Sequence, residues 1–279
     1  MTENKFGTYA LSGWRTKLLT FAQSLPANWL GKRLALICRK LVLKNGPSII
    51  DASIDNMHFR LHMRDNVSER KFLFLPQFFD RFERTLLSQE LTPASTFIDI
   101  GANAGIYTLT AAATGARVIA IEPNPVVLER LQFNLAVNQL SHLVSTIQKG
   151  VSDQTGSFAL TLDTSNLGGS SLVSDRCGPS LTIECVLLLT ILQEQGVTQI
   201  DALKIDIEGA EDRALLPFFN QAPTSLLPKL IIIENSEAQW GVDLPTLFKQ
   251  KGYQCLKRTR MNSIWKLLGK SAPATFHYI

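Results

Sequence analysis

The chain has 279 residues, of which 45% are hydrophobic, and a net charge of +4. This length and apolar content fit one large folded domain, with or without an appendage, and exclude intrinsic disorder as the default. No uninterrupted apolar run reaches the roughly 18 residues that a membrane-spanning helix needs. Four scattered cysteines without a C-x-x-C pair argue against a disulfide framework and a zinc site, and they favour a reduced, cytoplasmic compartment.

The basic charge is concentrated at the N-terminus. The first 44 residues hold eight lysines and arginines and one glutamate, a net charge of +7, so the rest of the chain sums to −3. A helical pattern covers residues 14–43 and is broken at Pro26. Its second half carries an apolar stripe at helical spacing, formed by Leu30, Leu34, Ile37 and Leu41. The opposite arc carries the basic residues Lys32, Arg33, Arg39, Lys40 and Lys44.

Two interpretations of this amphipathic segment stay open. The stripe can pack against the chain's own domain, with the charges in water. Alternatively, residues 14–44 can hold the protein peripherally on an anionic membrane, at its inner face in a cytoplasmic protein.

The remaining elements are expected in an order typical of an α/β domain. Residues 49–95 read as a lead-in, with an alternating strand around residues 57–63 and a helix at 78–91. Strands are then expected at 97–100, 117–121, 143–149, 181–187, 201–206, 229–234, 253–258 and 262–268. Helices are expected at 104–113, 125–138, 209–219 and 242–251. The alternation predicts a mostly parallel sheet with both faces covered and an antiparallel hairpin at its C-terminal edge. We expect three segments, namely 1–48, a basic helical extension; 49–95, the lead-in; and 96–279, the cofactor-binding domain.

The sequence FIDIGANAG at residues 97–105 is the most informative motif. Gly101 ends a strand and Gly105 stands where a helix can begin, so the backbone can approach a ligand closely. The next strand ends in Glu122, twenty-one residues after Gly101, where a carboxylate can accept hydrogen bonds from two ribose hydroxyls. A dinucleotide site needs G-x-G-x-x-G, and this turn is one glycine short. S-adenosylmethionine has no phosphate and needs an acid near its amino-acid end, where Asp99 stands, so it is favoured over NAD.

Ligands of an open parallel sheet bind beyond the carboxyl ends of the strands. The expected cofactor-binding residues at these ends are Asp99, Gly101, Ala102, Asn103, Gly105, Glu122, Asn124, Val151 and Asp206. The expected catalytic residues are Asp206, Glu208 and Glu234. Helix capping is the competing explanation for Glu208 and Glu211, but it accounts poorly for Glu234 and Asn235 after an apolar strand.

Methyl transfer to a hydroxyl needs a base or a metal, because a free hydroxyl is a poor nucleophile. The carboxylates offer both routes. Asp206, Glu234 and Asn235 are arranged in sequence like the magnesium site of catechol O-methyltransferase, and all-oxygen ligands suit Mg²⁺. General-base catalysis and metal assistance both stay open.

Four segments in order, FIDIGANAGIYTLT, AIEPNPVVLERLQFNLAVN, ALKIDIEGAED and LIIIENSE, resemble the FkbM-type family of S-adenosylmethionine-dependent methyltransferases. The resemblance covers about residues 60–268. It implies a Rossmann-like class I methyltransferase fold with a mostly parallel seven-stranded sheet. It also implies methylation of a hydroxyl on a saccharide, glycolipid or polyketide-like acceptor. One departure is visible, since the family commonly has Thr-Leu-Asp where this chain has Leu188-Leu189-Thr190, and the role of that aspartate is in doubt here.

Two other functions remain as alternatives. A non-catalytic module with this fold is compatible with the altered position at Thr190. However, a site that has lost its catalytic function is not expected to keep several uncompensated carboxylates close together. Nucleic-acid methylation is weaker, because no Asn-Pro-Pro-Tyr-like tetrad occurs and the catalytic region is slightly acidic, which a phosphate backbone disfavours. We therefore expect no nucleic-acid partner.

Overall fold

The structure is a computed structural model that describes residues 4–172 and 179–268. Glu3 and Cys177, which enter the sequence arguments above, lie outside these ranges. Cys38, Cys185 and Cys255 are free thiols. In the described ranges, no helix combines the length and the apolar character needed to cross a bilayer.

A seven-stranded sheet forms the centre of the fold. In spatial order its strands are β11 (Tyr253–Arg258), β12 (Asn262–Leu267), β10 (Leu230–Glu234), β9 (Ala202–Ile205), β3 (Thr96–Ile100), β4 (Arg117–Ile121) and β5 (Val144–Ile147). The strands from β10 to β5 are parallel, whereas β12 is antiparallel to both its neighbours. This order confirms the predicted Rossmann-like class I methyltransferase fold with its antiparallel edge hairpin.

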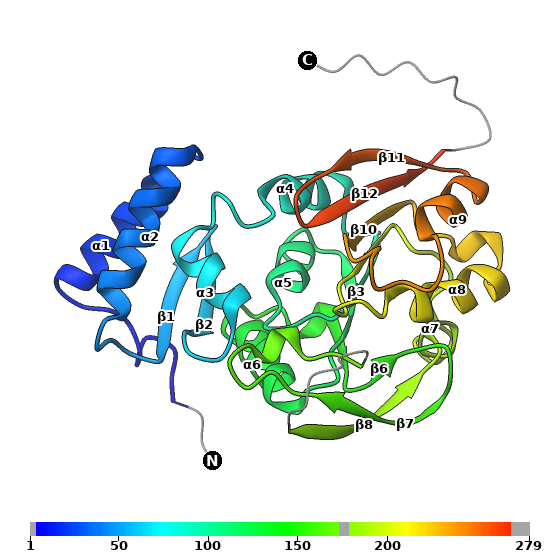
Figure 1. Cartoon of the computed structure of the whole chain (residues 1–279), viewed down its shortest axis with the longest axis horizontal. Helices are drawn as coiled ribbons and strands as arrows, with labels where there is room; N and C mark the ends of the chain where they lie inside the picture. The colour runs from blue at the N-terminus through cyan, green and yellow to red at the C-terminus, as the bar shows by residue number, and fades with distance from the viewer. Residues whose placement is uncertain (1–3, 173–178, 269–279) are drawn as a thin grey trace.

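Helices cover both faces of this sheet (Figure 1). Their bounds are α4 (Arg81–Glu90), α5 (Ile106–Ala112), α6 (Pro125–Val137), α7 (Leu188–Glu194), α8 (Glu211–Gln221) and α9 (Leu244–Gln250). Alternate strand residues enter two separate apolar clusters: Phe97 faces α4, α5 and α6, and Ile98 faces α7, α8 and α9. Successive side chains of β3 therefore point to opposite faces of the sheet and are buried on both, as is typical of a parallel sheet.

The N-terminal extension holds two helices, α1 (Trp14–Ser24) and α2 (Trp29–Leu43). The lead-in places a β-hairpin and one helix ahead of α4, namely β1 (Ile49–Ile54), β2 (Met57–His62) and α3 (Val67–Phe74). The sequence analysis found β2 but not β1 or α3. The signal for the hairpin was present, because Asp55 and Asn56 both take positive φ in its two-residue turn, where Asp and Asn are favoured.

The side of α2 that is buried differs from the predicted apolar stripe. Ala35, Cys38 and Val42 are buried, whereas Ile37 and Leu41 are 55% and 46% exposed. Small side chains allow α1 and the domain to approach α2 closely, and this leaves the larger residues outside. The interpretation in which the stripe packs against the domain is therefore wrong, although α2 itself is well packed.

One apolar cluster runs from α1 and α2 through the lead-in to the α5–α6 face of the sheet. The division at residues 48 and 95 stays a prediction.

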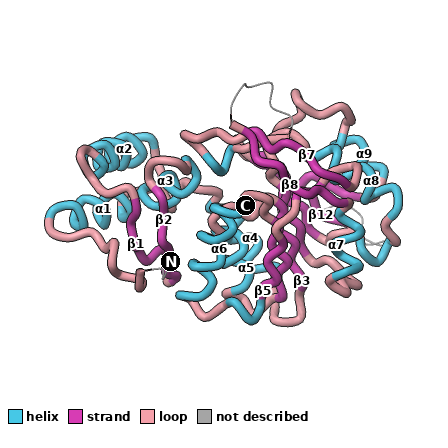
Figure 2. The backbone as a smooth tube through the Cα atoms, turned by 90° about the horizontal axis from the view of Figure 1, so that it is seen from below, coloured by secondary structure: helices cyan, strands magenta, loops and turns pink. Residues whose placement is uncertain are grey.

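A small second sheet follows β5. It consists of β6 (Gly150–Val151), β8 (Ser180–Val186) and β7 (Gly156–Thr161), with β8 between the other two. Short 3-10 turns complete the described chain at η1 (Ser141–Leu143), η2 (Leu167–Gly169) and η3 (Thr224–Leu226). Figure 2 shows β7 and β8 at one end of the strands of the main sheet, and α1 and α2 at the opposite end of the molecule from α8 and α9.

Candidate active site

Two glycines shape the turn after β3. Gly101 has a φ of +75°, and a Cβ there would overlap with the carbonyl oxygen of Asp206. Gly105 has a φ of +91°, and its Cβ would overlap with the side chain of Leu131 in α6. Both conformation and close approach therefore require glycine. The turn brings its backbone to the carboxyl end of β3, as the sequence predicted.

Asn103 attaches the lead-in to this turn. Its backbone has a φ of 50°, in the left-handed region that asparagine tolerates better than most residues. Its Oδ1 accepts hydrogen bonds from the backbone N–H of Ala104 at 2.8 Å and from Nδ2 of Asn66 at 2.7 Å. Asn66 caps α3, so the start of that helix is fixed against the glycine turn.

Glu122 lies at the end of β4 and joins two turns. Its Oε2 accepts from the backbone N–H of Asn103, and its Oε1 accepts from the backbone N–H of Asn124, both at 3.0 Å. Burial raises the pKa of Glu122 to about 7, although these two hydrogen bonds oppose the shift. Each carboxylate oxygen can accept a second hydrogen bond, so the side chain can still receive two hydroxyls.

A buried lysine holds the acids beneath the turn. Lys204 in β9 is 5% exposed, and its Nζ lies 3.3 Å from Asp206 Oδ2 and 4.0 Å from Asp99 Oδ1. It also donates to the Gly101 carbonyl at 3.2 Å. Burial by itself would lower the pKa of Lys204, but Asp206 and Asp99 outweigh it and raise the pKa. The lysine therefore stays charged and neutralises part of this acidic end of the sheet.

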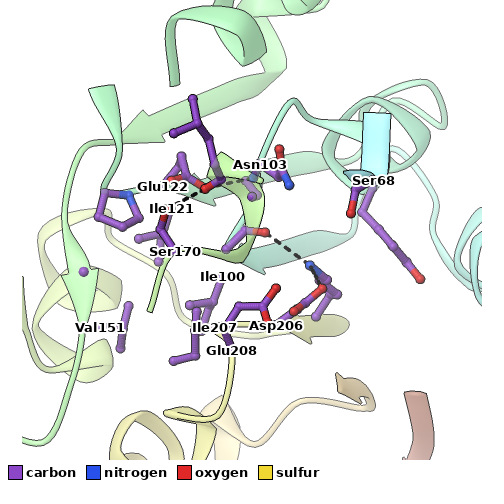
Figure 3. Close-up of a pocket in the computed structure, with 18 of the residues that line it drawn as sticks. Ser68, Ile100, Asn103, Ile121, Glu122, Val151, Ser170, Asp206, Ile207 and Glu208 are labelled. Atoms are coloured by element: carbon purple, nitrogen blue, oxygen red, sulfur yellow. Dashed lines mark hydrogen bonds and ion pairs between the residues drawn. The ribbon is translucent and has the colours of Figure 1, made fainter. Parts of the chain in front are cut away.

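These groups surround a cavity of about 960 Å³ of empty space, which includes its open mouth. It lies beyond the carboxyl ends of β3, β4 and β9, where an open parallel sheet binds its ligands. Figure 3 shows Glu122 and Asn103 on one part of the wall, with Asp206 and Glu208 next to each other on another.

The loop at residues 162–172, which leads from β7 through η2, forms a further wall of the cavity. Leu167 lines the cavity, and its backbone N–H donates to the carbonyl of Asp65 just before α3. The hydroxyl of Ser171 donates to the Glu208 carbonyl at 2.9 Å. This glycine- and serine-rich loop thus connects the lead-in with the turn after β9.

Asp80 is a cavity residue that the sequence analysis missed. It precedes α4 at the N-cap position, but its side chain makes no capping hydrogen bond. Instead its Oδ2 accepts from the hydroxyl of Tyr107 at 3.2 Å, and both residues line the cavity. Burial raises the pKa of Asp80 to about 6; Glu83 and Asp206 add to the shift, and the Tyr107 hydrogen bond opposes it. In the sequence, an aspartate at this position would be assigned to helix capping.

A family model for the FkbM methyltransferase domain matches residues 99–255, which is more than half of the chain. The chain belongs to the FkbM methyltransferase family. It is 32% identical over 152 residues to methyltransferase sdnD of Sordaria araneosa, a match that covers 43% of this chain and 59% of that protein. The chain thus spans less than two thirds of the curated relative that it matches.

Solved structures similar to this FkbM domain are distant in sequence. A SAM-dependent methyltransferase from Agrobacterium tumefaciens has a TM-score of 0.42 and 11% identity, with coverage of 73% of this chain and 57% of that chain. The Pyrococcus abyssi tRNA (uracil-54, C5)-methyltransferase, solved in complex with S-adenosyl-L-homocysteine, has a TM-score of 0.44 and 13% identity, with coverage of 79% and 44%.

The FkbM domain brings most of the predicted cofactor residues to the cavity. The cavity wall includes Gly101, Ala102, Asn103, Glu122, Val151 and Asp206. Three others lie behind it: Gly105 begins α5, Asn124 caps α6, and Asp99 is fully buried, where it accepts a hydrogen bond from the Thr108 hydroxyl at 2.6 Å. Asp99 therefore supports the turn and does not form part of the wall. Burial raises its pKa, and Lys204 opposes that shift.

The three predicted catalytic acids do not lie together on the wall. Asp206 and Glu208 line the cavity, whereas Glu234 is outside the set of described residues that form it. Glu234 accepts a hydrogen bond from Ser236 at 3.0 Å. Burial raises its pKa to about 8, and the nearby acids, Asp206 first among them, add to the shift. Glu211 is structural: its carboxylate accepts from the backbone N–H of Ile207 at 2.9 Å, as the capping explanation expected.

The residues predicted to bind magnesium are Asp206, Glu234 and Asn235. Asn235 donates through Nδ2 to the Thr259 carbonyl at 3.0 Å, and among the described residues its buried Oδ1 has no hydrogen-bond partner. Within residues 4–172 and 179–268, no group of three or more His, Cys, Asp or Glu side chains is placed to hold a metal ion. The magnesium prediction thus receives no support from this arrangement.

Proposed function

We propose that this protein is an S-adenosylmethionine-dependent O-methyltransferase that acts on a hydroxyl of a small saccharide, glycolipid or polyketide-like acceptor. Membership of the FkbM family supports the reaction class. The observation that carries the proposal is that the glycine turn with Glu122 shares one cavity with Asp80.

In this proposal the cofactor is bound by the glycine turn, by Glu122 and by the acids around Lys204. Glu122 receives the two ribose hydroxyls, and the backbone at Gly101 and Ala102 allows close approach of the adenosylmethionine. The sulfonium is positively charged, and Asp206 supplies a nearby negative charge to attract it. Because Lys204 offsets only one carboxylate, this part of the cavity remains favourable for a cation.

Asp80 is the base in this proposal. A general base works best when its pKa is near the operating pH, and the pKa of Asp80 is raised to about 6. The acceptor oxygen attacks the methyl carbon in line with the carbon–sulfur bond, and the bond's electron pair returns to sulfur, which leaves neutral S-adenosylhomocysteine. The acceptor's proton passes to Asp80, so charge and atoms balance. Positioning of the two substrates in one cavity supplies most of the remaining acceleration.

Two alternatives are distinguished by experiment. A magnesium ion at Asp206, Glu234 and Asn235 would make activity sensitive to chelators. A non-catalytic module would bind adenosylmethionine without consuming it.

A mass-spectrometric screen of hydroxylated acceptors with labelled adenosylmethionine tests the proposal. We expect at least one saccharide or polyketide-like acceptor to gain the labelled methyl group in step with the formation of S-adenosylhomocysteine. Cofactor binding without turnover on any acceptor class would favour the non-catalytic module.

A further inference from the structure

Helices α1 and α2 form an antiparallel hairpin at one end of the molecule, away from the seven-stranded sheet (Figures 1 and 2). Arg15, near the start of α1, donates through Nε to the carbonyl of Val42, near the end of α2, at 3.3 Å. The active-site cavity draws its walls from other elements, so this hairpin has no part in the chemistry proposed above.

The side of the hairpin that faces the domain can be assigned on each helix. On α1, Gln23 donates to the carbonyl of Leu73 in α3 at 2.8 Å. On α2, the Lys32 ammonium lies 5.9 Å from the centre of the Phe78 ring. These two contacts mark the inner direction of each helix.

Large apolar side chains lie on the opposite, outer side. At about 100° per residue, Trp14 and Phe21 project some 160–180° from Gln23 around α1. On α2 the stripe residues lie some 140–180° from Lys32 by the same geometry. We call this side the outer face and define it by Trp14, Phe21, Leu30, Ile37 and Leu41, together with Trp29 at the hairpin tip. Six of the ten large hydrophobic residues that are exposed in the described chain belong to this face.

The exposure is substantial for each member. Trp29 is 70% exposed, Leu30 58%, and the smallest value on the face is 46% for Leu41. Several large, exposed apolar side chains on one side of a helix pair indicate an interaction site in a folded protein.

The two helices that carry the outer face bear charge of one sign. Residues 14–44 contain seven lysines and arginines and no acidic residue. Within the part of the chain that the structure describes, none of these seven forms a salt bridge with a carboxylate. Arg33 lies 4.9 Å from the ring centre of Trp29, and Arg15 lies 4.8 Å from that of Trp14, so cations stand directly beside exposed aromatic rings.

We propose that the outer face docks the protein reversibly on an anionic lipid surface. Apolar side chains can enter the boundary between headgroups and acyl chains, while lysines and arginines extend to the anionic headgroups. Tryptophan suits the same boundary because its ring is amphipathic. A second copy of the chain is a poorer partner, because a two-fold contact across this face would bring two sets of unneutralised cations together.

Vesicle flotation with the full-length protein tests the proposal. The probes are vesicles of neutral phosphatidylcholine and vesicles containing roughly a third anionic phosphatidylglycerol, both at low and at high salt. Each basic residue near an anionic surface contributes roughly fivefold to binding. We therefore expect binding to anionic vesicles to exceed binding to neutral ones by at least about tenfold, and to weaken as salt is raised. Equal or absent binding to both kinds of vesicle would overturn the proposal.

A charge-raising variant separates docking of the outer face from general attraction to a basic protein. In Ile37→Lys/Leu41→Lys, positive charge increases while the apolar contact is lost. Docking predicts a fall in vesicle binding of about tenfold, whereas attraction by charge alone predicts a rise. Leu268→Lys is the matched control, because Leu268 is 40% exposed and lies outside the hairpin, and it should bind as the wild type does.

Two further readouts use the same proteins. Ile37 and Leu41 are both exposed, so the melting temperature of the double lysine variant should remain near the wild-type value. If that variant unfolds, Arg33→Gln/Lys40→Gln/Lys44→Gln replaces it. This charge-removal variant should lose binding to anionic vesicles while it keeps the apolar face. Sedimentation in solution tests whether a second copy of the chain binds the outer face instead of lipid. A wild-type dimer that Ile37→Lys/Leu41→Lys converts to a monomer would contradict the lipid proposal and assign the face to a second copy.

Discussion

The hydroxyl of Tyr107 donates a hydrogen bond to Asp80 Oδ2 at 3.2 Å, and this contact joins the first helix of the cofactor domain to the lead-in. Tyr107 belongs to α5, which follows the glycine turn, whereas Asp80 precedes α4. The two residues lie on the wall of one cavity. A group that the lead-in supplies is therefore held beside the cofactor turn.

Asp80→Asn should abolish most of the turnover while the fold is retained. Loss of a general base costs about 10²–10⁴ in rate, so we expect kcat to fall by at least about 10². The melting temperature should change little, since the Asp80 side chain does not cap α4. Steady-state kinetics and thermal melting check this, with Glu129→Gln on the exposed side of α6 as the control. Normal turnover in Asp80→Asn would remove this residue from the mechanism.

The pH dependence of turnover should follow the ionisation of Asp80. The base must be deprotonated to act, and its pKa is raised to about 6, so the rate should rise as the pH passes upward through about 6. The hydrogen bond from Tyr107 opposes this raised value. Tyr107→Phe should therefore move the ascending limb of the pH–rate profile to higher pH. A limb that stays in place or moves to lower pH would show that Tyr107 does not act through Asp80.

Glu122→Gln should weaken the binding of S-adenosylmethionine and S-adenosylhomocysteine by about 1–3 kcal/mol, the range for hydrogen bonds to a charged group. Gln is preferred over Ala because it keeps the shape of the side chain and one of the two acceptor oxygens that bind the backbone N–H groups of Asn103 and Asn124, whereas Ala removes both. Calorimetric titration measures the effect, with Glu129→Gln again as the control. NAD should show no binding to the wild type, and equal affinity for NAD would contradict the assignment of the turn.

Glu234→Gln tests whether this acid takes part in catalysis or only lies near the site with its charged form disfavoured. Its folded-state pKa of about 8 lies above the ordinary 4.5, so its contribution to stability is present below about 4.5 and lost as the pH rises through about 8. Gln removes the buried charge, so the variant should gain about 1–3 kcal/mol over the wild type at pH 9 and little at pH 4. Denaturant unfolding at both pH values measures this. Turnover within about threefold of the wild type is expected, and a 10²-fold loss would restore Glu234 as a catalytic residue.

Chelation separates the protein-only route from metal assistance. Because no group of three or more His, Cys, Asp or Glu side chains is placed to hold a metal among the described residues, prolonged treatment with EDTA should leave the rate unchanged. Activity that is lost on chelation and restored by Mg²⁺ would instead support a metal held by Asp206, Glu234 and Asn235.

The sequence predicted the cofactor side of the site because topology alone brings it together. Gly101, Glu122 and Asp206 follow three strands, and parallel strands place their carboxyl ends at one edge. Asp80 could not be found in this way. Its approach to the cavity depends on how the lead-in packs, and that packing involves contacts such as Asn66 with Asn103 that leave no periodic signal.

The interpretation in which the α2 stripe packs against the domain is wrong for a different physical reason. Helical spacing correctly identified a stripe of large apolar residues, but small side chains such as Ala35 and Cys38 allow a closer approach of neighbouring elements. Packing therefore buried the small residues, and the larger ones remained on the outer face. Hydrophobicity alone gives the position of an apolar stripe on a helix, but it does not show which element, if any, packs against that stripe.

The fate of the methyl group tests the proposed O-methylation most directly. The wild-type protein would be incubated with adenosylmethionine carrying a ¹³C-labelled methyl group and with the acceptor that the screen identifies, and the product would be followed by carbon NMR. We expect a methoxyl resonance that grows in proportion to S-adenosylhomocysteine and that fails to grow with Asp80→Asn. A labelled methyl group on nitrogen or carbon, or S-adenosylhomocysteine formed without a methylated acceptor, would contradict the proposed O-methylation.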